Sequence, residues 1–173
     1  MSRRNFICAA ACTVALFHCV PAIPAANKTA PMDAPDAFKV DDRQVLLLTH
    51  AVGAQIYECK TDISGGMNWV FREPIAALFG DGETVGRHYV GPAWELAEGD
   101  IVEGKQVAVA PGATSDDLAL LKLDILKNSG NGILKNATLV LRLNTRGGVL
   151  KGVCQTAGEF RAEPYSADYV FLQ

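Results

Sequence analysis

The sequence predicts an all-β protein, either an antiparallel β-sandwich or a flattened barrel, with at most short helical turns. Its 173 residues include 16 Gly, a share above the average of about 7% that favours many tight turns. Apolar residues occur in short runs, and several of these runs alternate with polar residues with a period of two. Clusters of Gly, Asn and Asp separate the runs, as in proteins built from short strands. We find no internal repeat and no second domain.

The first 25 residues have the three parts of a signal peptide. Arg3 and Arg4 precede an apolar run from Phe6 to Val20, and small residues follow up to Ala25. The run of about 15 residues is shorter than the roughly 20 that span a bilayer, so we expect no stable membrane span after cleavage. The Arg pair also resembles the twin-arginine consensus, although ordinary leaders carry such pairs, and both export routes stay open. We therefore expect an exported protein, periplasmic or secreted.

Residues 26–40 are rich in Ala, Pro and Asp and lack apolar periodicity, which predicts a flexible tether. A single β-rich domain is then expected over residues 41–173. All acidic residues lie beyond the leader, and the whole chain carries a formal net charge of −3 at pH 7. A mildly acidic domain without a basic patch argues against nucleic acid as a partner.

Cys59 and Cys154 are the two cysteines beyond the predicted leader. In an oxidising compartment they permit a single disulfide, and two independent buried thiols are the alternative. A bridge would close a loop of about 95 residues and contribute on the order of 4 kcal/mol in the chain-entropy model. The chain has no CxxC motif, and only His50 and His88 remain beyond the leader. We therefore predict no redox dithiol, metal site or cofactor.

The first strands are expected at short apolar runs bounded by turn residues. Val45–Leu48 and Gln55–Cys59 are predicted strands, and Met67–Phe71 continues the sheet after a turn at residues 61–66. The segment Pro74–Phe79 could form one short helical turn, because Pro suits a first helical position and a Gly follows the segment.

The second half of the chain alternates more strictly. Leu121–Ile125 and residues 137–144 both alternate, and the turn-forming residues 128–132 between them predict a hairpin. Leu118–Leu126 could instead form a helix capped by residues 114–117. The stricter period of two favours the strand.

A second turn is predicted at Asn144–Gly148, followed by a run from Val149 to Val153. The chain then ends on four side chains that face one way in an extended segment, namely Tyr165, Ala167, Tyr169 and Phe171. We expect this last strand to lie inside the sheet rather than at its edge.

Five motifs, taken in order, resemble the DUF3455 family of exported proteins of unknown function. They are Gln55–Cys59, Gly86–Glu95, Arg142–Gly148, Cys154 and Tyr165–Phe171. The resemblance covers about residues 43–173 and implies a small exported domain with paired Cys positions and no established activity. The chain departs from the family pattern near Leu118–Leu121 and just after Glu95. If those loops frame a site, its ligand here differs from that of relatives.

The segment from His88 to Glu95 is the best candidate site. A His has an ordinary pKa suited to a general base, and Glu95 could orient its ring. Tyr89 and Trp94 in the same segment are candidate ligand-binding aromatics. The alternative is a purely structural role, in which these aromatic side chains fill the core and the ring of His88 makes a structural hydrogen bond.

Two charged residues elsewhere are further candidates for ligand binding. Arg146 could hold an anionic ligand, although the Asn and Gly residues around it also suit a plain turn. Asp168 interrupts an otherwise apolar strand, where carboxylates are uncommon, and a position on the solvent face is the alternative.

Two classes of function fit these patterns. The preferred hypothesis is an exported binding module for a cell-envelope component, a glycan or a small apolar molecule. The alternative is a small exported enzyme, hydrolytic or metal-assisted, centred on His88 and Glu95. We prefer the first because the sequence offers no G-x-S-x-G elbow and no complete set of acid, base and nucleophile.

Overall fold

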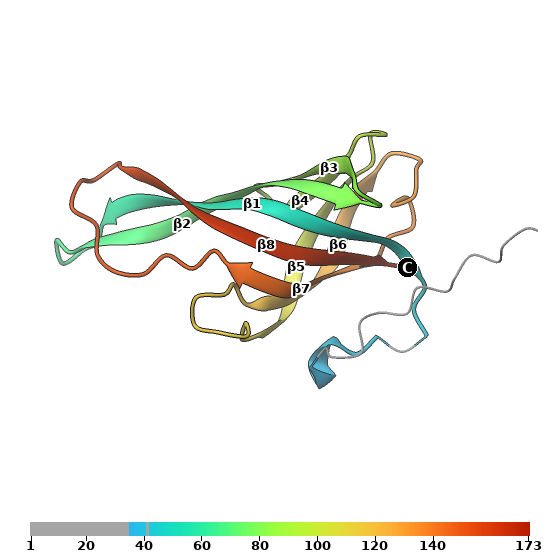
Figure 1. The fold of residues 1–173 in the computed structure, drawn as a ribbon, viewed down its shortest axis with the longest axis horizontal. Coiled ribbons are helices and arrows are strands. Elements are labelled where there is room, and N and C mark those ends of the chain that lie inside the picture. The colour runs from blue at the N-terminus through green and yellow to red at the C-terminus, as the bar shows by residue number, and fades with distance from the viewer. Residues whose placement is uncertain (1–34, 41) are drawn as a thin grey trace, which may run out of the picture.

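The fold is one antiparallel sheet of eight strands that closes into a barrel (Figure 1). A computed structural model describes residues 35–40 and 42–173. The strands are β1 (Val45–Thr61), β2 (Met67–Gly80), β3 (Glu83–Tyr89), β4 (Ala93–Leu96), β5 (Ile101–Ala110), β6 (Leu120–Ser129), β7 (Leu139–Gly147) and β8 (Phe160–Leu172). Each strand pairs with its neighbour in the sequence, and β8 pairs with β1. The all-β prediction is confirmed, and the last strand lies inside the sheet as expected.

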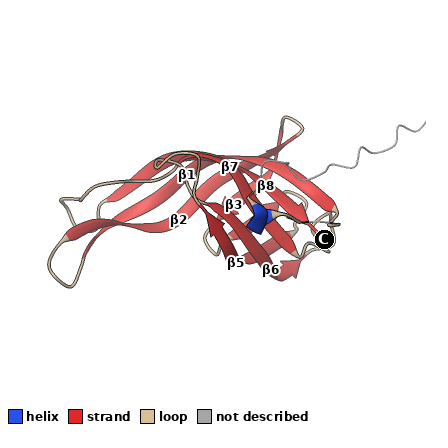
Figure 2. Cartoon of the chain, turned by 90° about the horizontal axis from the view of Figure 1, so that it is seen from below, coloured by secondary structure: helices blue, strands red, loops and turns tan. Residues whose placement is uncertain are grey.

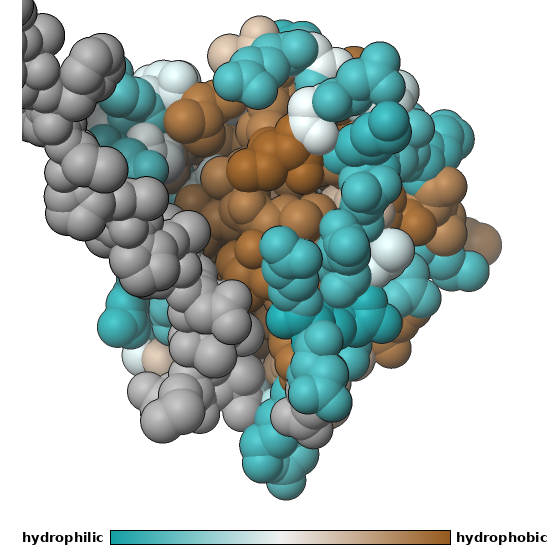
Figure 3. Space-filling view, turned by 90° about the vertical axis from the view of Figure 1, so that its right-hand side faces the viewer, coloured by the Kyte–Doolittle hydropathy of each residue, from teal (hydrophilic) through white to brown (hydrophobic). Residues whose placement is uncertain are grey.

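Period-two alternation places every second side chain inside the barrel. The interior is filled by apolar and aromatic side chains from all around the ring, among them Ala51, Leu78, Trp94, Val102, Val140, Tyr169 and Phe171. Figure 3 looks at the barrel end opposite the β1–β2 hairpin and shows hydrophobic surface in its middle, with hydrophilic residues above it and to its right. The apolar core therefore reaches this end of the barrel.

β1 and β2 are long and, with the start of β8, project from the barrel as a twisted arm (Figure 1). The two predicted strands Val45–Leu48 and Gln55–Cys59 are therefore parts of one strand. Gly53 lies between them, and a Cβ there would sit 2.0 Å from the Ile75 carbonyl oxygen. The missing side chain lets the two backbones approach closely enough to continue the pairing.

The predicted helical turn at Pro74–Phe79 is wrong, because this segment belongs to β2. Ala76 and Leu78 are buried while Ile75 is exposed, which is the alternation of a strand with one face toward a core. Cross-strand pairs such as Ala51 with Leu78 fix the segment against β1. Tertiary pairing thus overrides the local Pro and Gly signals.

β6 and β7 form the hairpin that alternation predicts, and the helix considered for Leu118–Leu126 is not formed. The turn predicted at Asn144–Gly148 is also wrong, since β7 continues to Gly147 with an irregular register against β8. Asn144 and Gly147 have φ values of 50° and 67°, so the turn-forming residues serve a bulge inside the strand. Beyond it, Val153 makes only an isolated bridge with Asn68.

The start of the described chain packs on the outside of the barrel. Asp36–Phe38 form a 3₁₀ turn that lies against the outer face of the strands (Figure 2). Phe38 is 1% exposed and joins an outer apolar cluster with side chains of β7 and β8, including Leu139, Leu141 and Val170. Residues 35–40 are the part of the expected tether that the structure describes, and there the buried side chain of Phe38 holds the chain against the barrel. The predicted leader lies outside the described residues.

Cys59 and Cys154 form a disulfide with a Cα–Cα distance of 5.7 Å, so the predicted bridge is confirmed. It joins the end of β1 to the connection between β7 and β8 across 95 positions of sequence. Among the described residues, no helix is long and apolar enough to cross a membrane.

Removing the disulfide should lower the free energy of unfolding by about 4 kcal/mol, because the unfolded chain regains the freedom of a loop closed over 95 positions. The double variant C59S/C154S and the wild-type protein are compared by urea unfolding, each with and without reductant. Reductant should bring the wild type to the level of the variant and leave the variant unchanged. A wild-type curve that reductant does not move would contradict the expectation.

Candidate functional site

A cavity of about 480 Å³ opens into the barrel near the base of the β1–β2 arm. Side chains of β1, β2, β3, β5 and β7 line it, together with the β3–β4 turn and the start of β6. The volume lies in the range of roughly 300–1,000 Å³ that is typical of small-molecule sites. Most of its wall is apolar, so the few polar groups that face it determine which polar groups of a ligand it can bind.

Gln55 and Arg142 are the first two of these polar groups. Gln55 on β1 is 2% exposed, and its Nε2 has no hydrogen-bond partner among the described residues. Arg142 on β7 donates from Nε and Nη2 to the Ala119 carbonyl oxygen at 3.1 and 2.9 Å. Both side chains line the cavity. Because a buried donor without a partner is costly, Gln55 marks a place where a ligand oxygen would be stabilised.

His88 on β3 is the third polar group and is 3% exposed. Its Nδ1 lies 2.8 Å from the Ala93 carbonyl oxygen, which can only accept, so Nδ1 carries the proton and Nε2 is left as an acceptor. Burial lowers the pKa of His88 from 6.5 to about 4, with a smaller contribution from the positive charge of Arg142. At neutral pH the ring is therefore uncharged.

Aromatic side chains pack behind His88. Trp94 stacks on it with ring centroids 4.7 Å apart, and Tyr169 lies against both rings. Trp94 is 1% exposed and lies in the core rather than on the cavity wall, in agreement with the alternative of a purely structural role for this residue. Its Nε1 and the hydroxyls of Tyr165 and Tyr169 make no hydrogen bond of ordinary geometry within the described part of the chain. The two hydroxyls are polar neighbours of each other, of Gln55 and of Arg142. Burial raises the pKa of both phenols, so they stay protonated.

Glu95 does not meet His88. Trp94 is the cross-strand partner of His88, and Glu95 is that of Arg87. Since successive residues of a strand point to opposite faces, Glu95 lies outside the barrel, where it pairs with Arg87 at 2.7 Å. Arg87 also lies over the ring of Tyr89, 5.1 Å from its centroid. The predicted cluster of residues 88–95 is thus divided between the interior and the outer surface.

The other two predicted site residues also lie away from the cavity. Arg146 is exposed near the end of β7. Asp168 accepts hydrogen bonds from His50 Nδ1 and Asn144 Nδ2, both at 2.7 Å, on the outer face of the barrel. The alternative position of Asp168 on the solvent face is therefore the one observed. In the parts of the chain that the structure describes, no group of three or more His, Cys, Asp or Glu could hold a metal ion.

Sequence reasoning missed Gln55 and Arg142. The signal for Gln55 was its period-two spacing with Tyr57 and Cys59, all of which are buried. The signal for Arg142 was its spacing from Val140, which lies in the interior. Both signals become readable only once it is known which face of each strand points inward.

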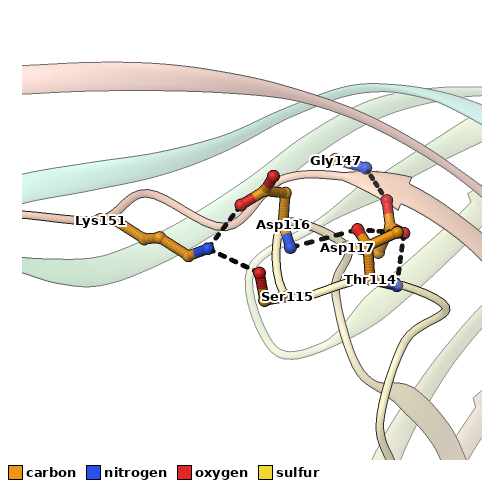
Figure 4. Close-up of polar contacts among 6 residues, drawn as sticks. All are labelled: Thr114, Ser115, Asp116, Asp117, Gly147 and Lys151. Atoms are coloured by element: carbon orange, nitrogen blue, oxygen red, sulfur yellow. Dashed lines mark hydrogen bonds and ion pairs between the residues drawn. The ribbon is translucent and has the colours of Figure 1, made fainter.

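The β5–β6 connection, residues 111–119, contributes Leu118 and Ala119 to the cavity wall. Asp117 holds this loop by accepting from Thr114 and from the Gly147 amide (Figure 4). These hydrogen bonds, led by the one from Gly147, lower the pKa of Asp117. Lys151 donates to Asp116 and Ser115 at 2.5 and 2.9 Å. The part of the cavity wall formed by this loop is therefore hydrogen-bonded to the end of β7.

The buried, neutral state of His88 should make stability depend on pH. Because its pKa is depressed in the folded protein, the unfolded chain takes up the proton first as pH falls. Stability should therefore decrease between pH 6.5 and about 4, by up to about 3 kcal/mol from this group alone. Urea unfolding of the wild type and H88Q across this range measures the difference in slope. Parallel curves would contradict the assignment.

Comparison with known proteins gives one match. No curated protein and no solved structure matches this chain. Residues 40–83 and 79–173 match a family described as "Protein of unknown function (DUF3455)", which covers almost all of the described chain. The resemblance of the five motifs is thereby confirmed, and the protein belongs to the DUF3455 family.

Proposed function

We propose that this protein is an exported binding module that holds a small, largely apolar molecule in the barrel cavity. The observation that carries the proposal is a cavity of about 480 Å³, mostly apolar, in a closed barrel. A closed ring of eight strands leaves an interior wide enough for side chains or for one small ligand. Among the ligand classes that the sequence permits, a small apolar molecule suits a mostly apolar cavity of this size better than an extended glycan.

The polar groups of the cavity support binding over catalysis. His88 is a weak base with a pKa of about 4, and Glu95 lies outside the barrel. An enzyme centred on these two residues would need Glu95 to contact the His88 ring, and this contact is not formed. Gln55, His88 and Arg142 instead resemble the small set of fixed polar groups that orients a ligand in an apolar site.

A bulky side chain at an exposed position of the cavity wall should weaken binding. Val90 lines the cavity and is 55% exposed, whereas Val52 is 49% exposed and does not line it. The fluorescent probe N-phenyl-1-naphthylamine, which is apolar and uncharged, is titrated into wild type, V90W and V52W. We expect stoichiometric binding to wild type and V52W, and at least tenfold weaker binding to V90W. Equal affinity in the two variants, or no binding to the wild type, would overturn the proposal.

Export is part of the proposal and rests on the predicted leader and on the disulfide, a bond that persists in oxidising compartments. The protein expressed from residues 1–173 should be recovered outside the cytoplasm with its N-terminus near residue 26. Intact mass spectrometry of the recovered protein measures the cleavage site. A mass that retains all 173 residues would contradict cleavage.

A further inference from the structure

We propose that the cavity selects ligands with a single anionic group, such as a carboxylate, which Arg142 binds while the apolar body of the ligand occupies the rest of the cavity. This inference rests on the proposed binding function and names the class of ligand. The first observation is that the positive charge of Arg142 has no ion-pair partner within the described residues, since no carboxylate among residues 35–40 and 42–173 lies within ion-pair distance of it.

The contacts of Arg142 leave room for a further partner. Its guanidinium has five N–H donors, and the Ala119 carbonyl oxygen accepts from Nε and Nη2 alone. A neutral carbonyl fixes the position of the group without cancelling its charge. Since a carboxylate matches the planar fork of a guanidinium, it is the complement that the remaining donors favour.

The second arginine of the cavity differs in this respect. Arg72 lies at the mouth, pairs with Glu73 at 3.0 Å and stacks over the ring of Phe160. Its charge is therefore already balanced by a neighbour on the same strand. One uncompensated positive charge remains at the cavity, which suits a monoanion rather than a phosphate with two charges.

Gln55 is a second polar residue of the cavity that could donate a hydrogen bond to a ligand. Gln55 lines the same cavity, and its buried amide nitrogen makes no hydrogen bond of ordinary geometry within the described chain, with the Tyr165 hydroxyl as its polar neighbour. A second oxygen of a bound carboxylate would supply an acceptor. His88 adds no competing positive charge, because its ring is neutral and already donates from Nδ1 to Ala93.

The test compares two competitors that share an apolar body and differ in their head group. Octanoate and 1-octanol are titrated at pH 7.5 against protein loaded with N-phenyl-1-naphthylamine. A purely apolar cavity would favour octanol, because a carboxylate loses more hydration on entry. We expect octanoate to displace the probe from wild type at concentrations at least tenfold lower than octanol.

R142Q should abolish this preference, because the charged contact is lost, and the ratio of the octanoate and octanol concentrations is taken within each variant so that a change in affinity for the probe does not enter the comparison. R146Q is the matched control, because Arg146 is exposed on the same strand outside the cavity, and it should retain the preference. Circular dichroism and thermal melting check that both variants fold.

Three results would overturn the inference. They are octanol binding wild type as tightly as octanoate, R142Q retaining the preference, or R146Q losing it as fully as R142Q. If R142Q does not fold, the comparison in the wild type decides alone. A failure of the probe to bind wild type at all would instead remove the proposed function, so the two failures are distinguishable.

Discussion

The pairing of β1 with β8 is the contact on which the rest of the molecule depends. It runs from Val45 opposite Leu172 to Glu58 opposite Phe160 and turns an open meander into a ring. Only a ring has an inside, so this pairing decides which face of every strand is enclosed. It also removes the unpaired edges that an open sheet would expose. The cavity, the inner core and the outer apolar cluster all follow from closure.

Closure explains why the sequence predicts the strands better than the site. Alternation of apolar and polar residues correctly indicates β6, β7 and the hairpin between them. It does not say which face of β7 points inward. Leu139, Leu141 and Leu143, the more apolar set, lie on the outer face beneath Phe38, whereas Val140 and Arg142 face the interior. The strand therefore has a buried residue on both faces, and periodicity alone cannot choose between them.

The same ambiguity affects the candidate site. A compact motif such as His88 to Glu95 looks like one cluster in the sequence, yet a strand divides its neighbours between two faces. The groups that do meet in the cavity, Gln55, His88 and Arg142, come from three strands that are distant in sequence. Their convergence depends on long-range register, which local patterns do not encode. The disulfide was easier to predict because two cysteines allow only one connection.

The outer cluster around Phe38 also constrains the order of folding. Phe38 precedes β1 in the chain, yet its apolar neighbours Leu139, Leu141 and Val170 belong to β7 and β8, which are synthesised much later. β1 likewise cannot complete its pairing before β8, its partner in the ring, has been synthesised. Contacts between segments so far apart close large loops and slow the search for the native pairing. The nascent chain can therefore form local hairpins during synthesis, but neither the ring nor its outer cover can assemble until the last strand has been released.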